Sequence, residues 1–254
     1  MPDADAVTDA LLDDWARICE ALGKPAFRRA TERAAALVSG VPAAPLNIVF
    51  TARTDASRFE VEALLRLVAE TGLPHSLEVR PGTAAELVAL PRDRGMTDGA
   101  RIPLMVLDAR AAAGVEPAPG SQLSIRRLAP EEAPLLASLL EAGFGMPSHV
   151  FQQLMTPGVL ALPGASCYVG SLDGEAVSTA FGFANGDHVG IYNVATRPEH
   201  RGRGFGAAIT ARAVVDGFAA GASYAFLQSS MLGYRGYERL GFREIESWAV
   251  WSSS

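Results

Sequence analysis

A basic, glycine-rich segment lies between an apolar run that ends at Thr196 and an alanine-rich helical pattern. Its residues are Arg201, Gly202, Arg203, Gly204, Phe205, Gly206 and Ala207. Because glycine carries no Cβ, the backbone here can adopt positive φ angles and bring successive amides close to an anion. The unpaired amides and dipole of the following helix favour negative charge, and the two arginines add positive charge. The segment therefore predicts a site for a phosphorylated cofactor.

Two other phosphate-binding patterns fit this segment less well. Gly202-x-Gly204-x-x-Ala207 formally matches the dinucleotide fingerprint, in which the first glycine closes a turn at the strand end and an acid follows about 20 residues on. Here five residues separate the strand from Gly202, and the next predicted strand ends in Gln228-Ser-Ser without an acid. A Walker-type loop would need a closing Gly-Lys-Ser/Thr, which is missing.

Two motifs in the C-terminal half resemble those of the GNAT superfamily of N-acetyltransferases. Arg201, Gly204 and Gly206 match its acetyl-CoA signature, Arg/Gln-x-x-Gly-x-Gly/Ala. Tyr237-Glu-Arg-Leu-Gly-Phe242 matches a second feature, a tyrosine four residues before a Gly-Phe that starts a strand. The motifs occur in order, joined by a helix and a strand, and the resemblance extends from about residue 124 to the C-terminus.

The elements that position these motifs follow from hydrophobic periodicity and turn signals. The predicted strands cover 123–127, 166–172, 176–184, 188–196, 224–228 and 243–251, and the predicted helices cover 130–142, 149–155, 205–219 and 232–240. Asp173-Gly174 and Asn185-Gly-Asp187 are typical hairpin turns. This succession is the one that the resemblance implies: an α/β fold with a mixed, largely antiparallel sheet flanked by helices.

The N-terminal half predicts a smaller α/β unit. One or two amphipathic helices are expected over 8–39, followed by strands at 46–50, 76–80 and 102–107 and helices at 56–70 and 84–90. The Pro/Gly-rich segment 114–120 predicts a boundary between domains 1–115 and 121–254. The element order parallels 191–251, so this unit is either a degenerate GNAT-like half or an unrelated appendage. Its loop, 51–56, contains no glycine, and we therefore expect one cofactor site, in the C-terminal domain.

The resemblance implies roles for particular residues. Backbone groups at the end of the fourth strand, where it splays from the fifth, would contact the acetyl carbonyl and the pantetheine arm; these are Val194, Ala195 and Thr196. The glycine loop would hold the pyrophosphate, and Tyr237 would be the general acid that protonates the departing thiolate. Ser229 and Ser230 are further cofactor-binding candidates that also suit a helix cap, and Ser230 stands where many relatives have an asparagine.

The sequence does not identify a general base. Strand 188–196 contains no carboxylate, and a water relay ordered by Tyr192 or Asn193 remains an alternative. The ionisable residues near the site fit solvated turns or surface positions: Asp173, Glu175, Asp187, His188, Glu199 and His200. The amine acceptor carries no readable motif.

Composition limits the remaining function classes. The net charge of −6 argues against nucleic-acid binding, and no secretory signal or membrane span is visible, so we expect a soluble, cytoplasmic protein without a membrane partner. Cys19 and Cys167 lack metal-ligand spacing, so we expect reduced structural thiols and no metal. The leading hypothesis is an acetyl-CoA-dependent N-acetyltransferase acting on a primary amine of a small molecule or peptide. The first alternative is a regulatory module that binds coenzyme A with little turnover, and the second is a nicotinamide-binding enzyme. The sequence leaves the oligomeric state open, and a homodimer is one of the alternatives.

Overall fold

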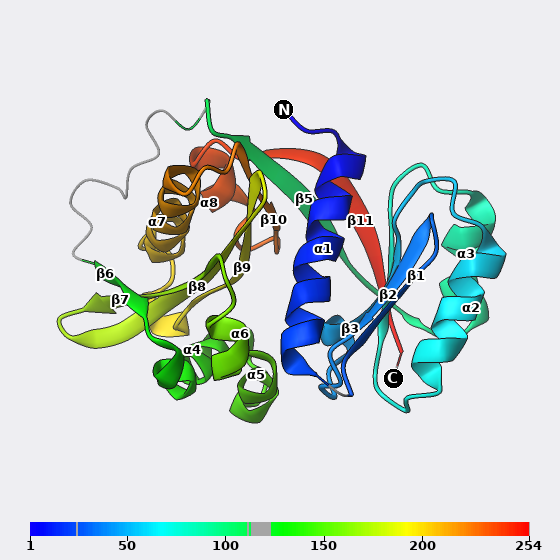
Figure 1. The fold of residues 1–254 in the computed structure, drawn as a ribbon, viewed down its shortest axis with the longest axis horizontal. Helices are drawn as coiled ribbons and strands as arrows, with labels where there is room; N and C mark the ends of the chain where they lie inside the picture. Colours follow the sequence, from blue (N-terminus) through cyan, green and yellow to red (C-terminus); the bar gives the residue numbers. More distant parts are fainter. Residues whose placement is uncertain (24, 111, 113–122, 254) are drawn as a thin grey trace. The chain divides into compact units, whose positions relative to one another are not determined.

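The computed structural model describes residues 1–254 except 24, 111, 113–122 and 254. The chain forms two compact units (Figure 1). One consists of Met1 and Met105–Glu244, and the other consists of Pro2–Leu104 and Ile245–Ser254. Each has a mostly antiparallel sheet with helices against it, which confirms the predicted fold class. No helix in the described part of the chain combines the length and the apolar character that a bilayer span requires.

The N-terminal unit is built on an antiparallel hairpin followed by a parallel crossover. Its elements are α1 Ala4–Leu22, β1 Phe27–Ala30, β2 Ala34–Val38, β3 Asn47–Thr51, α2 Arg58–Ala69, β4 Ser76–Val79, α3 Ala85–Asp93 and β5 Thr97–Asp108. Strand β2 pairs antiparallel with β1 and β3, and β3 pairs parallel with β4 across α2. Helix α1 lies on one face of this sheet and α2 and α3 lie on the other (Figure 1).

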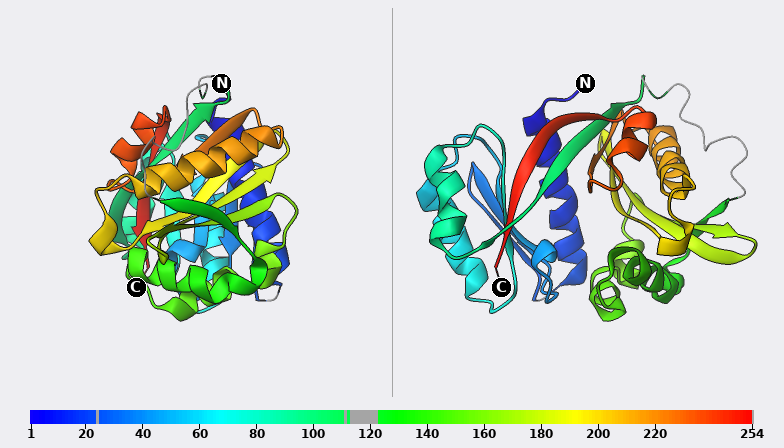
Figure 2. Two further views of the ribbon diagram at one scale, coloured as in Figure 1. Left: turned by 90° about the vertical axis from the view of Figure 1, so that its left-hand side faces the viewer. Right: turned by 180° about the vertical axis from the view of Figure 1, so that it is seen from behind.

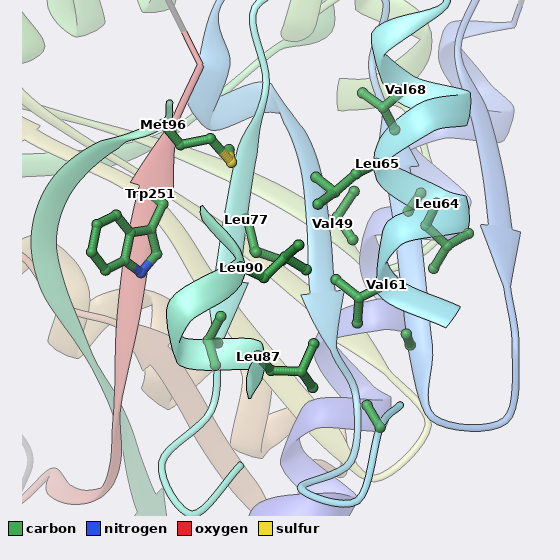
Figure 3. Close-up of a cluster of buried hydrophobic side chains, with 14 of the residues drawn as sticks. Val49, Val61, Leu64, Leu65, Val68, Leu77, Leu87, Leu90, Met96 and Trp251 are labelled. Atoms are coloured by element: carbon green, nitrogen blue, oxygen red, sulfur yellow. The ribbon is translucent and has the colours of Figure 1, made fainter. Parts of the chain in front are cut away.

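The core of this unit forms where α2 and α3 meet the sheet (Figure 3). Apolar side chains from the strands, such as Val49 and Leu77, contact the helical residues Val61, Leu65 and Leu87, and all five are 1% exposed or less. Helix α2 repeats its apolar residues at helical spacing, so one face is apolar and packs on the sheet.

Residues 27–38 contradict the helical prediction for 8–39. The alanine-rich sequence there has a helical propensity, yet it forms β1 and β2, and all five residues of β2 are buried. Their pairing with β3 and their burial in the core outweigh local propensity, which is a weak preference. The predicted helix is confirmed for α1, which ends at Leu22 before Gly23, whose φ is +67°.

The C-terminal unit follows the predicted order closely. Its elements are β6 Ser124–Leu128, α4 Ala133–Phe144, α5 Ser148–Leu154, α6 Pro157–Leu160, β7 Ala165–Leu172, β8 Glu175–Asn185, β9 His188–Thr196, α7 Phe205–Ala219, β10 Tyr224–Gln228, α8 Tyr234–Arg239 and β11 Arg243–Ser252. Strands β6 to β9 pair antiparallel in sequence order, and β9 pairs parallel with β10. Helices α7 and α8 lie on one face of the sheet and α4 lies on the other (Figure 2).

Strands β5 and β11 each run from one unit into the other. In the N-terminal unit β11 pairs with β4 through residues 249–252, and in the C-terminal unit β5 is the neighbour of β10. Each half therefore completes its sheet with the last strand of the other half. The compact units differ in this respect from domains 1–115 and 121–254, and the predicted boundary segment 114–120 lies outside the described residues.

Candidate cofactor and catalytic site

Strand β9 carries a bulge shortly before its end. Thr179 pairs with Ala195 and Phe181 pairs with Tyr192, so two residues of β9, Asn193 and Val194, oppose one residue of β8. Asn193 has a φ of +51°, a conformation that asparagine tolerates better than most residues. A bulge re-aims the backbone of the strand that contains it. The sequence analysis missed this bulge; an asparagine inside an apolar strand pattern was the available signal.

Beyond the first three residues of β9, its pairing with β10 ends. His188, Val189 and Gly190 pair with residues 224–226, and the rest of β9, up to Thr196, has no registered partner on β10. The splay that the resemblance implies is therefore present in the strand register. The end of β9, which includes Val194, Ala195 and Thr196, therefore lies beyond the last pair of this ladder.

The glycine loop presents unpaired amides. Gly202 and Gly204 have φ angles of +75° and +80°, both are exposed, and open space surrounds the position that a Cβ would occupy. Among the described residues, no acceptor pairs with the backbone amides from Gly202 to Ala207. Helix α7 begins at Phe205 with Gly204 as its N-cap, and no side chain caps it. The loop and the helix dipole thus form an anion-binding arrangement.

The two arginines of the loop are engaged by protein groups. Arg201 Nη2 donates to the Gly143 carbonyl at 2.6 Å and Nε donates to the Thr196 carbonyl at 3.3 Å, so this side chain links the loop to α4 and β9. The Arg203 guanidinium lies over the Phe205 ring, 4.8 Å from its centroid. Both guanidinium groups belong to the same loop as the free amides.

The start of α7 lies against the end of β9. A Cβ added at Gly206 would lie 3.5 Å from Thr196 Oγ1, and that hydroxyl is 3.0 Å from Ser178 Oγ. The Phe205 side chain is 4% exposed and packs in an apolar cluster with Val177. Only the backbone of Phe205 can therefore contact a cofactor. The structure brings the loop and residues 194–196 together, as the sequence predicts.

Tyr237 lies on α8 against the core beneath α7. Its ring packs with the cluster that contains Ile209 and Phe242, and its centroid is 6.0 Å from that of Phe242 in an edge-on arrangement. Burial raises the pKa of the Tyr237 phenol to about 12. The Thr210 hydroxyl is itself buried, without a hydrogen-bond partner among the described residues. An unpaired buried hydroxyl costs about 1–3 kcal/mol.

The two serines after β10 form hydrogen bonds within the turn that contains them. Ser229 is 1% exposed and its hydroxyl donates to the Ser230 carbonyl at 2.7 Å. The Ser230 hydroxyl accepts from the Gly233 amide at 3.2 Å, close to the start of α8. The Ser230 hydroxyl thus stabilises the turn before α8, while the helix itself begins at Gly233 without a side-chain cap, and a cofactor role for either serine stays a prediction.

The candidates for a general base lie at both ends of β9: His188 opens the strand, and Glu175 lies just beyond its end, 4.0 Å from both Arg197 Nε and His200 Nε2. His188 is 6% exposed, which corrects the predicted surface position, and it lies eight residues, or about 26 Å of extended strand, before Thr196. Glu175, Glu199 and His200 have ligand atoms within 4.8 Å of one another, a grouping that sequence spacing did not reveal. Both glutamates are exposed.

A cavity of about 220 Å³ lies away from this site, between the second half of α7 and strands β7 and β8. Asp216 at its edge accepts hydrogen bonds from Tyr168 at 2.9 Å and from Arg127 at 3.0 Å. The two cysteines are free and buried, and burial raises the pKa of Cys19 to about 11 and that of Cys167 to about 12. Both thiols are therefore unreactive, as expected.

Comparison with known proteins decides the family of this site. Residues 136–242, which contain β9, the glycine loop, α7 and Tyr237, match the model of the Acetyltransferase (GNAT) family. This segment is a GNAT acetyltransferase domain. The family implies acyl transfer from an acyl-coenzyme A.

Solved structures that resemble the chain share its fold along nearly its whole length. A GCN5-related N-acetyltransferase from Kribbella flavida is 21% identical, with a TM-score of 0.72 over 100% of this chain and 96% of that one. A GCN5-related N-acetyltransferase from Sphaerobacter thermophilus is 15% identical, with a TM-score of 0.61 over 98% and 93%. A tandem GNAT protein from the clavulanic acid biosynthesis pathway is 15% identical, with a TM-score of 0.58 over 98% and 95%. The search of curated proteins found no match.

The N-terminal unit repeats the topology of the GNAT domain. The order β2, β3, α2, β4, α3, β5 corresponds to β8, β9, α7, β10, α8, β11, with the same antiparallel and parallel pairings. The ends of α3 and α8 also match: the Met96 amide donates to the Pro91 carbonyl, and the Phe242 amide donates to the Tyr237 carbonyl. These matches favour the degenerate GNAT-like half over an unrelated appendage.

Proposed function

We propose that the chain is an acetyl-CoA-dependent N-acetyltransferase that acylates a primary amine of a small molecule or peptide. The observation that carries this proposal is the row of unpaired amides from Gly202 to Ala207, next to the end of β9, which extends beyond its last pair with β10. A diphosphate fits the first group, because positive φ angles and a helix N-terminus aim several donors at one anion. The pantetheine arm, an extended chain that contains amides, fits the backbone at the end of β9.

Each part of the site has one task in this proposal. The loop amides, Arg201 and Arg203 bind the diphosphate, and the backbone of Val194, Ala195 and Thr196 orients the pantetheine arm and polarises the thioester carbonyl. The amine nitrogen attacks the carbonyl carbon, the carbon–sulfur bond breaks, and the Tyr237 phenol gives its proton to the departing thiolate. The proton lost by the amine returns to the phenolate through solvent. No metal is required.

A regulatory module that binds coenzyme A with little turnover is the second candidate. Two observations favour it. A phenol with a pKa of about 12 is a weaker acid than free tyrosine, and the Ser230 hydroxyl is committed to the turn before α8. Binding without chemistry would use the same loop and leave Tyr237 as a core aromatic residue.

An amine panel separates the two candidates. With acetyl-CoA and a thiol-release assay, we expect at least one amine to stimulate release above hydrolysis, and Tyr237→Phe to lower kcat by about 100-fold with an unchanged Kd for acetyl-CoA. Tyr234→Phe is the matched control, because that phenol lies one turn earlier and interacts with Glu244. Tight binding with only background hydrolysis across the panel would support the regulatory module.

A further inference from the structure

The guanidinium of Arg203 is held in place by neighbours that do not neutralise it. Its Nη1 lies 3.4 Å from Nδ1 of His200, and its central carbon lies 4.8 Å from the centroid of the Phe205 ring. Within the part of the chain that the structure describes, no carboxylate forms an ion pair with Arg203. A neutral imidazole accepts a hydrogen bond without contributing negative charge. The positive charge of Arg203 therefore remains available to an anion.

The contact with Arg203 fixes the tautomer of His200. A guanidinium can only donate hydrogen bonds, so Nδ1 of the imidazole is the acceptor and Nε2 carries the proton. Nε2 faces the Glu175 carboxylate, and 4.0 Å separate Nε2 from Oε2. The Glu199 carboxylate belongs to the same group, in which the ligand atoms of Glu175, Glu199 and His200 lie within 4.8 Å of one another. The acidic side of the ring thus favours the tautomer that accepts from Arg203.

His200 is the more firmly held partner of this pair. It ends the short 3₁₀ turn Pro198–His200 after β9, its amide donates to the Arg197 carbonyl at 2.9 Å, and its side chain is 16% exposed. The imidazole also lies near the Phe205 ring, with 6.4 Å between the two centroids. Phe205 is buried and begins α7, whereas Arg203 is exposed. The imidazole is therefore a fixed acceptor beside the glycine loop.

We propose that His200 is a positioning residue that holds the Arg203 guanidinium at the glycine loop for the diphosphate of coenzyme A. This inference rests on the proposed function, in which that loop binds the diphosphate. A free arginine side chain loses rotamer freedom when it binds an anion, and ordering it beforehand removes part of this cost. A carboxylate partner would also order it, but it would compete with the phosphate for the guanidinium. The contact with His200 uses one of five N–H donors, so donors remain for phosphate oxygens.

The alternative role for His200 is packing against Phe205 alone. Phenylalanine at position 200 would keep a ring there but supply no acceptor. Asparagine would lose the ring but keep an acceptor, because its Oδ1 occupies about the same place as Nδ1 of the imidazole. The two substitutions therefore have opposite expected effects under the two roles.

The test uses the full chain with His200→Phe, His200→Asn and Arg203→Met, each singly, and His200→Phe combined with Arg203→Met. By calorimetry with acetyl-CoA, we expect the affinity to fall about tenfold in Arg203→Met, about fivefold in His200→Phe and less than about twofold in His200→Asn. In the Arg203→Met background, His200→Phe should have no further effect. The same fold-changes are expected with dephospho-coenzyme A, which keeps the diphosphate and lacks the 3′-phosphate. The Tm of each variant should stay within about 2 °C of the unmodified chain, because these side chains lie at the surface.

The outcomes that overturn the inference are distinguishable from failure of the proposed function. If Arg203→Met weakens binding while His200→Phe binds normally, the loop site stands and the His200 role fails. If His200→Asn loses as much affinity as His200→Phe, or if His200→Phe has an equal effect in both backgrounds, the effect does not pass through the acceptor and the guanidinium. If the losses disappear with dephospho-coenzyme A, Arg203 binds the 3′-phosphate and the assignment to the diphosphate is wrong. If acetyl-CoA does not bind the unmodified chain, the proposed function fails and the inference fails with it.

Discussion

The pairs β3–β4 and β9–β10 have the same topology and differ in how far their pairing extends. In the N-terminal unit the parallel ladder reaches Phe50, the second-last residue of β3, and the Arg80 amide donates to the hydroxyl of Thr51, the last one. In the GNAT domain the ladder stops at Gly190 and leaves six residues of β9 beyond it. The first strand pair is closed almost to the end of β3, whereas the second leaves the end of β9 beyond its last pair, where we propose that the cofactor binds.

The helices that follow these strands differ in the same way. At α2, the Ser57 hydroxyl accepts from the Glu60 amide and the Glu60 carboxylate accepts from the Ser57 amide, which forms a capping box. The carboxylate already occupies the positive end of the helix dipole and would repel a phosphate. At α7, Gly204 supplies no cap, and the equivalent amides remain free.

Arginine side chains are also used differently in the two units. Arg80 follows β4, is 3% exposed, and donates to Glu246 at 2.7 and 2.8 Å, while its Nη1 contacts Asp5 at 2.6 Å. Arg53 forms a bidentate pair with Asp9 at 2.7 and 2.9 Å. These charges are neutralised within the N-terminal unit.

The two units also differ at the ends of α3 and α8. Pro91 stands at the position that Tyr237 occupies in the GNAT domain, so the N-terminal unit lacks a phenol there.

If the proposed cofactor site is correct, one topology supplies either a binding site or a closed scaffold, depending on which backbone groups have partners. Both units bury similar apolar faces beneath their crossover helices. The distinguishing features are a few residues at the strand ends and helix starts. Substitutions there should separate stability from binding.

The largest effect is expected from Arg80→Leu, which leaves Glu246 with only the Trp248 indole N–H and Asp5 with only Arg53 at 3.7 Å. The Arg80 side chain is 2% exposed and that of Glu246 11%, so we expect a loss of about 3–5 kcal/mol in the free energy of unfolding, measured with urea and circular dichroism. Arg126→Leu is the control, because Arg126 makes an equally bidentate pair with Glu132 but is 53% exposed, and we expect less than about 1 kcal/mol. Equal losses in both variants would contradict a structural role for the buried cluster.

The next effect is on binding. Gly204→Val places a β-branched residue at a φ of +80° and covers the amides at the start of α7, so we expect the affinity for acetyl-CoA to fall by about 100-fold, or about 2.8 kcal/mol, by calorimetry. Gly206→Ala should change the affinity by less than about threefold, since a Cβ there would meet Thr196 and Val194 at 3.5 and 3.8 Å, which is ordinary contact. Normal affinity in Gly204→Val would remove the loop from the site.

Much of the GNAT domain was predictable because its elements agree locally with its fold. The spans of β9, α7 and β10 match the predictions at both ends, since hairpin turns and glycines mark their limits. Residues 27–38 were not predictable, because an alanine-rich sequence becomes a strand only through its neighbours. The exchange of β5 and β11 between the two sheets was likewise not predictable, since the sequence of a strand does not by itself specify which strand it pairs with.

The site was predictable to the extent that it depends on backbone freedom and spacing. The glycines predicted the positive φ angles of the loop. The Gly-Phe that follows Tyr237 predicted the end of the helix on which that tyrosine lies. The bulge at Asn193 and the unpaired hydroxyl of Thr210 depend on partners from other strands and helices. A single sequence without a fold does not supply those partners.

The pH profile tests whether the surroundings of the partly buried Tyr237 raise the pKa of its phenol. The protonated phenol is the active acid, and its pKa is raised from 10 to about 12, so activity should be lost only as pH rises toward 12. At pH 10.5 roughly 3% of such a phenol is ionised, against roughly three quarters of an unperturbed one. We expect kcat to show no alkaline decline between pH 8 and 10.5, and a fourfold decline would contradict the raised pKa of this phenol.

The smallest effect should come from Ser57→Ala, which removes one half of the capping box of α2. We expect a loss of about 1 kcal/mol in the free energy of unfolding, with Ser57→Thr as a control that keeps a hydroxyl acceptor for the Glu60 amide. Acetyl-CoA affinity and a stoichiometry of one per chain should be unchanged, because the cap faces no cofactor. If calorimetry instead shows a second binding event in Ser57→Ala, the capping box is a block on a functional second site, and the N-terminal unit is not a closed scaffold.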